Sequence, residues 1–384
     1  MQYQRIQQVS AITRRKSCFL LGPRQTGKST LLRTQLNLVP TWNLLDLGVF
    51  LNVSADPTLI RRQIRAMKPK PEVVVIDEIQ KLPLLLNEVH LMIEEDKIKF
   101  VLTGSSARSL KRQGVNLLAG RARMTYLHPF VSHELGHDFD LLKALNRGLI
   151  PSIYLSDDFD AELADYAGTF LKEEIMSEGL TRNLPAFSRF LEIAAQCNGT
   201  MINFTTLASD SQVKRSTVVD WFDVLKDTLI AHELPAWKKS IKRKAIQTAK
   251  YYLFDLGVAR HLAKAPHITL RNKAFGDAFE HFIFLELKAA QSYSRLRDLH
   301  YWRSTSDFEV DFIVNDEIAI EAKGKVRLDA SDFKGLKAIG EEPNIKRRIV
   351  VSLAEQREIQ SGIEVIPWQE FLAEVWSKNE FKVP

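Results

Sequence analysis

The 384-residue sequence is poor in cysteine and contains no long apolar run. Its two cysteines, Cys18 and Cys197, do not have the spacing of metal ligands, and we expect both thiols to be buried and reduced, as in the cytoplasm. No stretch approaches the roughly eighteen apolar residues of a membrane-spanning helix. The first residues are polar and basic, which predicts no signal peptide. We therefore expect a cytoplasmic protein without a membrane partner.

Internal repeats and low-complexity segments are also lacking, so solenoid and fibrous architectures are not indicated. A chain of 384 residues exceeds what one hydrophobic core usually serves, which predicts two or three domains. The apolar content of 45% and the charged content of 26% are ordinary for a globular protein. A net charge of +6 permits nucleic-acid binding without establishing it.

The most informative feature present is a phosphate-binding loop. The run GPRQTGKST at 22–30 fits the pattern G-x-x-x-x-G-K-[ST], between an apolar strand at 18–21 and a helix from Thr30 to Leu36. Lys28 would reach the β- and γ-phosphates, and the Ser29 hydroxyl would bind Mg²⁺. Backbone N–H groups at the helix start would face the phosphates. We expect ATP to bind at Gly22, Pro23, Arg24, Gln25, Thr26, Gly27, Lys28, Ser29 and Thr30.

An acidic pair completes this site. Residues 73–76 are apolar and predict a strand buried on both faces of a parallel sheet, and Asp77 and Glu78 follow at its carboxyl end. Asp77 would hold the Mg²⁺, directly or through water, and Glu78 would orient or deprotonate the attacking water. Together, the loop and the acids predict ATP hydrolysis.

Four motifs, in this order, resemble a family of prokaryotic AAA+-type ATPases: GPRQTGKST, VVVIDEIQK, LTGSS and LAGRARM. The likeness continues at 182–184, 187–191, 252–257 and 366–368, so it covers essentially the whole chain. One departure is the segment 147–151, which lacks an expected second glycine. The resemblance implies an ATPase domain followed by a C-terminal domain of unknown function.

A polar residue after the next strand, 99–103, commonly contacts the γ-phosphate or the attacking water in AAA+ proteins. Thr103 or Ser106 is predicted to have that sensor role. Arg121 is our first candidate for an arginine finger in a neighbouring subunit's site, and Arg123 the second. A finger would imply a homo-oligomer. The alternative is a surface arginine paired with a local carboxylate.

Beyond residue 160 the pattern becomes helical. Apolar spacing predicts helices at 162–177 and 184–196, and then a pair at 203–209 and 214–229 with a break at 210–212. Lys214 and Arg215 at the start of the second helix of the pair are what a helix-turn-helix presents to a DNA groove.

A wing would follow, with strands at 229–237 and 250–254. Between them lies the run Lys238–Lys244, which has five basic residues in seven and no acid. Such a run can neutralise several phosphates, so DNA is a predicted partner through Lys214, Arg215 and this run. Two alternatives remain: the winged helix could form a lid on the nucleotide site, or the basic hairpin could simply be solvated.

The C-terminal third has the spacing of a PD-(D/E)XK nuclease core. Asp311 is followed after nine residues by Glu321-x-Lys323, and Glu280 lies on the preceding predicted helix. Glu280, Asp311 and Glu321 would hold Mg²⁺ or Mn²⁺, and Lys323 would orient the nucleophile or neutralise charge. The alternative is an amphipathic hairpin with a surface Glu–Lys pair.

The register of this hairpin can be predicted from its apolar residues. Strands at 308–314 and 318–323 alternate with period two, and their apolar faces coincide only if Val314 pairs with Ile318 and Phe312 with Ile320. This register requires a three-residue turn at 315–317 and places Asp311 opposite Glu321. Further strands at 347–352 and 363–366 and helices at 332–339 and 368–376 favour a restriction-endonuclease-like α/β domain.

Together, these observations predict an α/β protein of three parts. Residues 1–150 form a P-loop NTPase domain with a parallel sheet, 151–265 a helical and winged-helix region, and 266–384 a nuclease-like domain. The favoured function is an ATPase acting on or regulated by DNA. The alternative is a signalling or assembly ATPase whose last domain binds protein. A third hypothesis, a DNA-binding regulator with a vestigial ATPase site, conflicts with the presence of Lys28, Asp77 and Glu78.

Overall fold

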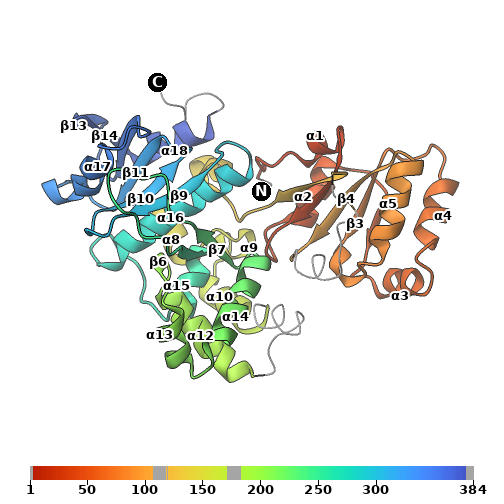
Figure 1. The fold of residues 1–384 in the computed structure, drawn as a ribbon. Coiled ribbons are helices and arrows are strands. Elements are labelled where there is room, and N and C mark those ends of the chain that lie inside the picture. The colour runs from red at the N-terminus through yellow and green to blue at the C-terminus, as the bar shows by residue number, and fades with distance from the viewer. Residues whose placement is uncertain (1–2, 107–117, 119, 171–182, 378–384) are drawn as a thin grey trace. The chain divides into compact units, whose positions relative to one another are not determined.

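The computed structural model describes residues 3–106, 118, 120–170 and 183–377. The chain divides into two compact units, one built mainly on residues 1–129 and the other mainly on residues 130–384. As far as the structure describes them, the first unit contains one β-sheet and the second contains two (Figure 1). Within the described residues, no helix combines the length and the apolar character needed to cross a membrane. The three-part division at residues 150 and 265 stays a prediction.

Five parallel strands form the sheet of the first unit. They are β1 (Ser17–Leu21), β2 (Thr41–Asn43), β3 (Val73–Asp77), β4 (Lys99–Gly104) and β5 (Ala122–Tyr126). Their spatial order is β2-β3-β4-β1-β5, so β4 lies between the strand that leads into the phosphate loop and the strand that ends in the acids. All three strands therefore direct their carboxyl ends toward one end of the sheet, where ligands bind in open α/β folds.

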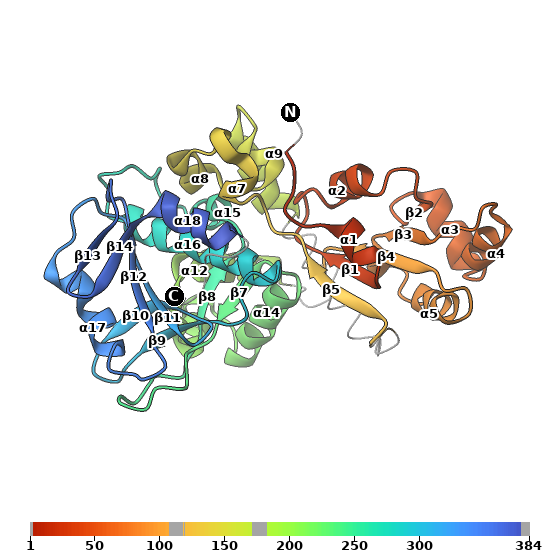
Figure 2. The same cartoon turned by 90° about the horizontal axis from the view of Figure 1, so that it is seen from above.

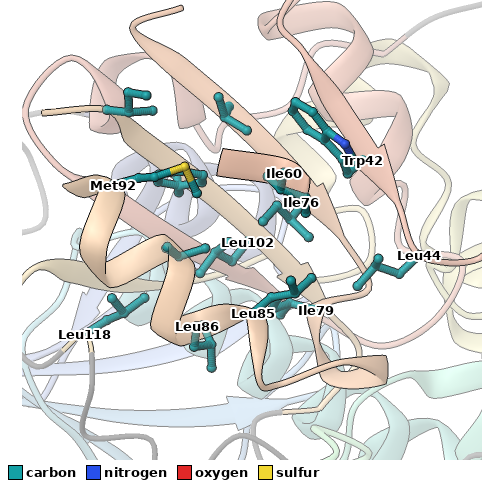
Figure 3. Close-up of a cluster of buried hydrophobic side chains, with 14 of the residues drawn as sticks. Trp42, Leu44, Ile60, Ile76, Ile79, Leu85, Leu86, Met92, Leu102 and Leu118 are labelled. Atoms are coloured by element: carbon teal, nitrogen blue, oxygen red, sulfur yellow. The ribbon is translucent and has the colours of Figure 1, made fainter. Parts of the chain in front are cut away.

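Helices cover both faces of this sheet. They are α1 (Val9–Thr13), α2 (Lys28–Gln35), α3 (Leu47–Ala55), α4 (Leu59–Ala66) and α5 (Leu85–Glu95), with a short 3₁₀ turn, η1 (Ile79–Lys81). Leu31 of α2 packs with Leu20 of β1 on one face. On the other face, Ile60 of α4 and Leu86 of α5 belong to the cluster around Ile76 and Leu102 (Figure 3). Burial on both faces explains why β3 and β4 read as continuous apolar runs.

The predicted elements around the phosphate loop are confirmed. The strand at 18–21, the helix at 30–36, the strand at 73–76 and the strand at 99–103 correspond to β1, α2, β3 and β4. Strands β2 and β5 and helices α3 to α5 were not predicted. The short β2 contributes only Trp42 to the core, and β5 exposes Arg123 and Met124, so neither has an apolar run that its sequence would reveal.

The second unit begins with short helices. These are α7 (Ser132–Leu135), η2 (Gly136–Asp138), α8 (Leu141–Arg147), α9 (Pro151–Tyr154), α10 (Phe159–Asp165), the π-helical turn η3 (Tyr166–Phe170), α12 (Leu184–Gln196) and α15 (Leu256–Leu262). The prediction for 184–196 is confirmed. The predicted helix at 162–177 is α10 followed by the π-helical turn, and its residues 171–177 lie outside the described residues.

A helix pair and a three-stranded sheet follow. They consist of β6 (Thr200–Met201), α13 (Phe204–Ser211), α14 (Arg215–Asp227), β7 (Ala231–Leu234) and β8 (Lys250–Leu253), with sheet order β6-β8-β7. In the middle of α14, Trp221 makes aromatic contacts with Phe187 and Phe190 of α12. The predicted break at 210–212 is wrong for its first two residues. Ser211 is fully buried and α13 runs through it, and the chain turns at Gln212, whose φ of 58° is left-handed.

Six strands form the sheet of the C-terminal part (Figure 2). They are β9 (Leu299–Arg303), β10 (Glu309–Val314), β11 (Ile318–Lys323), β12 (Arg347–Ser352), β13 (Glu358–Gln360) and β14 (Ile363–Pro367), in the order β13-β14-β12-β11-β10-β9. Val314 pairs with Ile318 and Phe312 with Ile320, so the predicted hairpin register is confirmed. The predicted pairing of Asp311 with Glu321 is not part of this ladder, which runs only from Phe312 to Val314 on β10.

Both faces of this sheet are covered. The covering helices are α16 (Ala274–Ser292), η4 (Ala330–Phe333), α17 (Lys334–Ile339) and α18 (Trp368–Trp376). Phe284 of α16 stacks on Phe312, whereas Leu336 of α17 shares a core with the adjacent Ile313. Since neighbouring strand residues point to opposite faces, α16 and α17 lie on opposite sides. The hairpin is therefore buried on both faces and does not have the solvent face of an amphipathic surface hairpin.

The segment 235–246 lies along the edge strand β9. The Trp237 N–H donates to Tyr301 O at 2.7 Å, and the Tyr301 N–H donates to Pro235 O at 3.1 Å. Further along, the Ile246 N–H donates to Arg303 O at 2.8 Å. The backbone groups of an edge strand need such partners, because unpaired they would invite association with another strand. The basic run that this segment contains is therefore fixed to the sheet and does not form a free wing.

Candidate functional site

The phosphate loop connects β1 to α2 in the conformation that its sequence predicts. Gly27 has a φ of 91°, in the left-handed region that favours glycine. A Cβ on Gly22 would lie 2.3 Å from Leu127 O, so no larger residue fits there. The Lys28 amino group is buried and donates to Gly22 O at 2.6 Å and to Pro23 O at 3.0 Å. The lysine is thus held over the loop, where a phosphate would compete for it.

Arg5 supports the loop through hydrogen bonds to backbone carbonyls, a role that the sequence analysis missed. Its buried guanidinium donates to Thr26 O at 2.7 Å, to His128 O at 2.6 Å and to Pro129 O at 3.2 Å. These bonds join the loop to the chain after β5. A single arginine ahead of the first strand carries no sequence signal for this role, because its partners are backbone carbonyls.

Asp77 connects the loop to β4. The Ser29 hydroxyl donates to Asp77 Oδ2 at 3.3 Å, and the buried Thr103 hydroxyl donates to Asp77 Oδ1. Ser29 is exposed at the start of α2. A hydroxyl and a carboxylate are the hard oxygen ligands that Mg²⁺ prefers, so the pair Ser29 and Asp77 fits the predicted metal ion. A cavity of about 360 Å³ opens beside these two residues and extends toward Arg33, Thr41 and Asn43.

Glu78 has an unusual backbone conformation. Its φ of 61° and ψ of 46° are left-handed, which costs a non-glycine residue free energy and recurs at functional sites. The Glu78 N–H donates to Thr103 Oγ1 at 3.0 Å, and the Gln80 side-chain amide donates to Glu78 Oε2. Gln80, which our sequence analysis quoted without a role, therefore orients the predicted catalytic carboxylate.

The other predicted ATPase residues differ in position. Ser106 is buried just beyond β4, and Thr103 contacts the acids Asp77 and Glu78. Arg121 forms an ion pair with Glu94, the local carboxylate pairing that was the alternative to a finger. Arg123 is exposed on β5. Pro23 and Thr26 are buried in the loop, whereas Arg24, Gln25 and Thr30 are partly or fully exposed.

In the second unit, the four predicted C-terminal residues come together from three elements. Glu280 lies on α16, Asp311 on β10, and Glu321 and Lys323 on β11. Lys323 Nζ lies 2.6 Å from Glu321 Oε1 and 3.9 Å from Asp311 Oδ2. Asp311 Oδ2 accepts the Ala322 N–H at 2.9 Å, so the carboxylate crosses to the neighbouring strand.

Two residues of β8 join this group, and the sequence analysis missed both. Lys250 Nζ lies 2.6 Å from Glu309 Oε1 and 3.4 Å from Glu280 Oε1. The Tyr252 hydroxyl donates to Glu280 Oε1 at 2.6 Å. The two residues are two apart on one strand, so the sequence indicates that their side chains share one face. This signal was overlooked because β8 was assigned to the wing.

Burial and mutual repulsion raise the pKa values of two of these acids. Burial, followed by the Asp311 carboxylate, raises the pKa of Glu280 to about 7 and raises that of Glu321 well above its usual value. Burial lowers the pKa of Lys250, but the surrounding carboxylates outweigh it and raise the pKa overall. The described part of the chain holds no group of three or more His, Cys, Asp or Glu side chains placed to bind a metal ion. The predicted Mg²⁺ or Mn²⁺ site at Glu280, Asp311 and Glu321 is therefore not supported.

The predicted DNA-contacting residues separate into two classes. Lys214 and Arg215 are exposed at the start of α14. In the basic run, Lys239 forms an ion pair with Asp316 at 2.6 Å and Arg243 one with Glu341 at 2.8 Å. The Glu342 carboxylate accepts the Ser240 hydroxyl and the Ile241 and Lys242 N–H groups at 2.6 to 2.9 Å. Acids in the turn between β10 and β11 and just after α17 thus hold much of the run.

Comparison with known families gives matches in three segments. Residues 14–136 match the family described as AAA domain. Residues 138–268 match a domain of unknown function (DUF8612), and residues 275–371 match another (DUF4143). Uncharacterized proteins of Mycobacterium tuberculosis and Mycobacterium bovis are each 27% identical over 311 residues, which cover 79% of this chain and 68% of the relative.

Solved structures give weaker likenesses. A Walker-type ATPase of Pyrococcus abyssi is 17% identical with a TM-score of 0.40, over 64% of this chain and 90% of that one. The Orc1 protein of Aeropyrum pernix, solved in complex with DNA, is 13% identical with a TM-score of 0.26, over 67% of this chain and 90% of that one. TM-scores this low do not establish a shared fold. Residues 14–136 thus match an AAA domain model and contain the parallel sheet and the phosphate loop that such a domain requires.

Proposed function

We propose that the first unit binds ATP with Mg²⁺ and hydrolyses it at the carboxyl ends of β1, β3 and β4. One observation carries the proposal: hydrogen bonds connect the Ser29 hydroxyl, the Asp77 carboxylate, the Thr103 hydroxyl and the Glu78 N–H in one continuous chain. Such a chain fixes the metal-binding oxygens and the base relative to each other before substrate arrives. Preorganised polar groups of this kind supply much of the catalysis in phosphoryl transfer.

Each residue has a distinct role in this proposal. Lys28 exchanges its carbonyl partners for the β- and γ-phosphates and neutralises their charge. Ser29 and Asp77 are the residues that would hold Mg²⁺, which supplies further charge neutralisation when bound. Glu78, held by Gln80, orients the attacking water and accepts its proton. Thr103 keeps both acids in position.

Replacing Lys28 by alanine tests the phosphate-binding half of the proposal. Because the lysine would make charge-assisted hydrogen bonds to phosphate, Lys28→Ala should weaken MgATP binding by about 10-fold or more. Isothermal titration calorimetry measures the affinity. The matched control is Lys16→Ala, an exposed lysine one residue before β1 whose loss should change nothing. Equal affinities of wild type and Lys28→Ala would show that nucleotide does not bind at this loop.

A second candidate function, DNA binding, is favoured by the start of α14. The left-handed turn at Gln212 leads into a helix whose first residues, Lys214, Arg215 and Ser216, are exposed. Three cation- or hydroxyl-bearing residues at a helix N-terminus suit phosphate contact. This geometry supports a helix-turn-helix assignment for the pair α13 and α14. The ion pairs of Lys239 and Arg243 make the basic run a weaker candidate.

Removing the two charges at the start of α14 tests DNA binding. The double variant Lys214→Ala/Arg215→Ala should bind a labelled duplex about 10-fold more weakly at low salt, and the slope of log K against log salt should fall by about two. Fluorescence anisotropy measures both. The control variant Lys226→Ala/Lys264→Ala removes the same charge from other positions and should bind normally. If neither the wild type nor the variant binds DNA at low salt, the assembly-ATPase alternative replaces this proposal.

The C-terminal segment also supports a fold proposal. We propose that residues 274–376 adopt a restriction-endonuclease-like fold, because the acid-bearing hairpin pairs in the predicted register and β11 continues into the parallel strands β12 and β14. The proposal concerns the fold alone. Whether its acids form a catalytic centre depends on what neutralises them.

A further inference from the structure

Amino and guanidinium groups of the chain itself neutralise the carboxylates of the C-terminal part. Four carboxylates, which we call the acid cluster, lie close together: Glu280, Glu309, Asp311 and Glu321. Lys323 contacts Glu321 and Asp311, and Lys250 contacts Glu280 and Glu309. Arg303 Nη1 lies 3.4 Å from Glu309 Oε2. Three cationic side chains thus face four carboxyl groups, and the raised pKa values of Glu280 and Glu321 lower the negative charge of the cluster further, which leaves little charge for a bound metal ion to neutralise.

Lys250 lies among the carboxylates, where a metal ion would have to bind. Its side chain is only 6% exposed, and its ammonium lies between acids from two different elements, Glu280 of α16 and Glu309 of β10. A third side is closed by the Tyr301 ring, whose centroid lies 5.4 Å from Nζ. Lys323 belongs to the predicted nuclease spacing, but Lys250 comes from β8, outside it. The sequence pattern therefore lacks the cation that the fold supplies.

A divalent metal and this ammonium compete for the same oxygens. Mg²⁺ and Mn²⁺ require several carboxylate or water oxygens at roughly 2.0–2.2 Å, whereas the oxygens of Glu280 and Glu309 that face Lys250 already accept its N–H groups. A metal ion placed among them would also lie a few ångströms from a buried positive charge, where repulsion is weakly screened. The residues present do not fit a metal while Lys250 is in place.

We infer that the Lys250 ammonium takes the place of a divalent metal in the acid cluster, so that Lys250, Glu280 and Glu309 form a buried ion-pair site joining β8 to α16 and to the six-stranded sheet. The cluster then serves to hold the two sheets of the second unit together. Metal-dependent cleavage would require the Lys250 ammonium to move out of the acid cluster.

Replacing Lys250 by methionine tests the inference, because methionine keeps the length of the side chain without the charge. In the full chain without nucleotide, Lys250→Met should bind about one more Mn²⁺ per chain than wild type, measured by electron paramagnetic resonance of free Mn²⁺. The matched control is Lys264→Met, which removes a lysine from a surface ion pair with Glu192 and should gain none. A folded Lys250→Met variant that gains no Mn²⁺ would contradict the inference.

A second variant keeps the inference testable if Lys250→Met does not fold. Asp311→Asn in the otherwise wild-type chain should leave Mn²⁺ binding unchanged, because the acid cluster holds no metal. A loss of bound Mn²⁺, with circular dichroism showing an intact fold, would mean that the wild-type cluster binds metal beside Lys250 and would overturn the inference. In a folding Lys250→Met background, Asp311→Asn should abolish the gained site.

Discussion

Glu78→Gln should bind MgATP as tightly as the wild-type chain and hydrolyse it at least about 100-fold more slowly, since general-base catalysis contributes factors of roughly 10² to 10⁴. Glutamine has the same size and still accepts hydrogen bonds, so the water can be bound but its proton cannot be taken. Single-turnover hydrolysis of radiolabelled ATP measures the chemical step, and calorimetry measures binding.

The structure explains why this carboxylate, rather than the adjacent Asp77, should be the base. Asp77 accepts the hydroxyls of Ser29 and Thr103, so both of its oxygens are engaged. Glu78 has a left-handed backbone, and its Oε2 oxygen accepts the Gln80 side-chain amide. The strained conformation at this position is retained because the Thr103 hydroxyl fixes the Glu78 N–H.

Glu72→Gln is the matched control for this experiment. Glu72 is exposed just before β3, on the same segment but at the end away from the site, and its substitution should leave the rate within about twofold, as is usual for surface positions. Equal hydrolysis by wild type and Glu78→Gln would show that another group activates the water.

The ATPase site was predictable because its chemistry is local in sequence. The loop at 22–30 and the acids at 77 and 78 each combine a buried strand with the residues at its end, so one short segment specifies both the position and the function. Arg5 and Gln80 were not predictable in the same way. Arg5 binds backbone carbonyls far along the chain, which any residue could supply.

The C-terminal site shows where sequence reasoning stops. The pairing of Val314 with Ile318 followed from apolar alternation, and the structure has it. Alternation says nothing about what covers each face, so it could not reveal that α16 and β8 bury the acids or that β8 brings Lys250. Whether another element supplies a cation depends on the tertiary structure. The PD-(D/E)XK spacing alone therefore cannot distinguish a metal site from an ion-pair site.

Asp255→Ala should give the largest loss of stability that we expect from a single substitution in the second unit, about 3 to 5 kcal/mol. The fully buried Asp255 carboxylate caps α15 by accepting the Val258 N–H at 3.0 Å, and it also accepts the Leu149 N–H at 2.6 Å. Alanine would orphan both donors, of which the Val258 N–H is the capped one, and each unsatisfied buried group costs about 1 to 3 kcal/mol.

The same contacts explain the single glycine of the segment 147–151. A Cβ on Gly148 would lie 2.0 Å from the Asp255 carboxylate, and a Cβ on Gly257 would lie 2.2 Å from Arg147 O. Gly148 also has a φ of 78°. One glycine on each side of the contact is therefore required, and the next residue, Leu149, is buried and has no such constraint.

Urea unfolding followed by tryptophan fluorescence measures the stability, because five of the six tryptophans lie beyond residue 129: Trp221, Trp237, Trp302, Trp368 and Trp376. The matched control is Asp140→Ala. Asp140 caps α8 by accepting the Lys143 N–H at 2.7 Å but is exposed, so its loss should cost only about 1 kcal/mol. Equal losses in the two variants would show that burial of the Asp255 carboxylate adds nothing.

The pH dependence of stability gives an independent test of this residue. Burial outweighs the backbone N–H donors and raises the pKa of Asp255 from 3.8 to about 6. Since the folded state then binds the proton more tightly than the unfolded state, the contribution of this group is greatest below about pH 4 and is lost as the pH rises through 6. A shift of this size corresponds to roughly 3 kcal/mol.

Asp255→Asn, which cannot titrate, should therefore show a smaller fall in unfolding free energy between pH 4 and pH 7 than the wild-type chain. Burial also raises the pKa of Glu286 to about 7, and this residue contributes a fall of the same sign in both proteins. The difference between the two curves thus isolates Asp255. Parallel curves would mean that Asp255 is ionised throughout this range and that its N–H donors, rather than burial, dominate its environment.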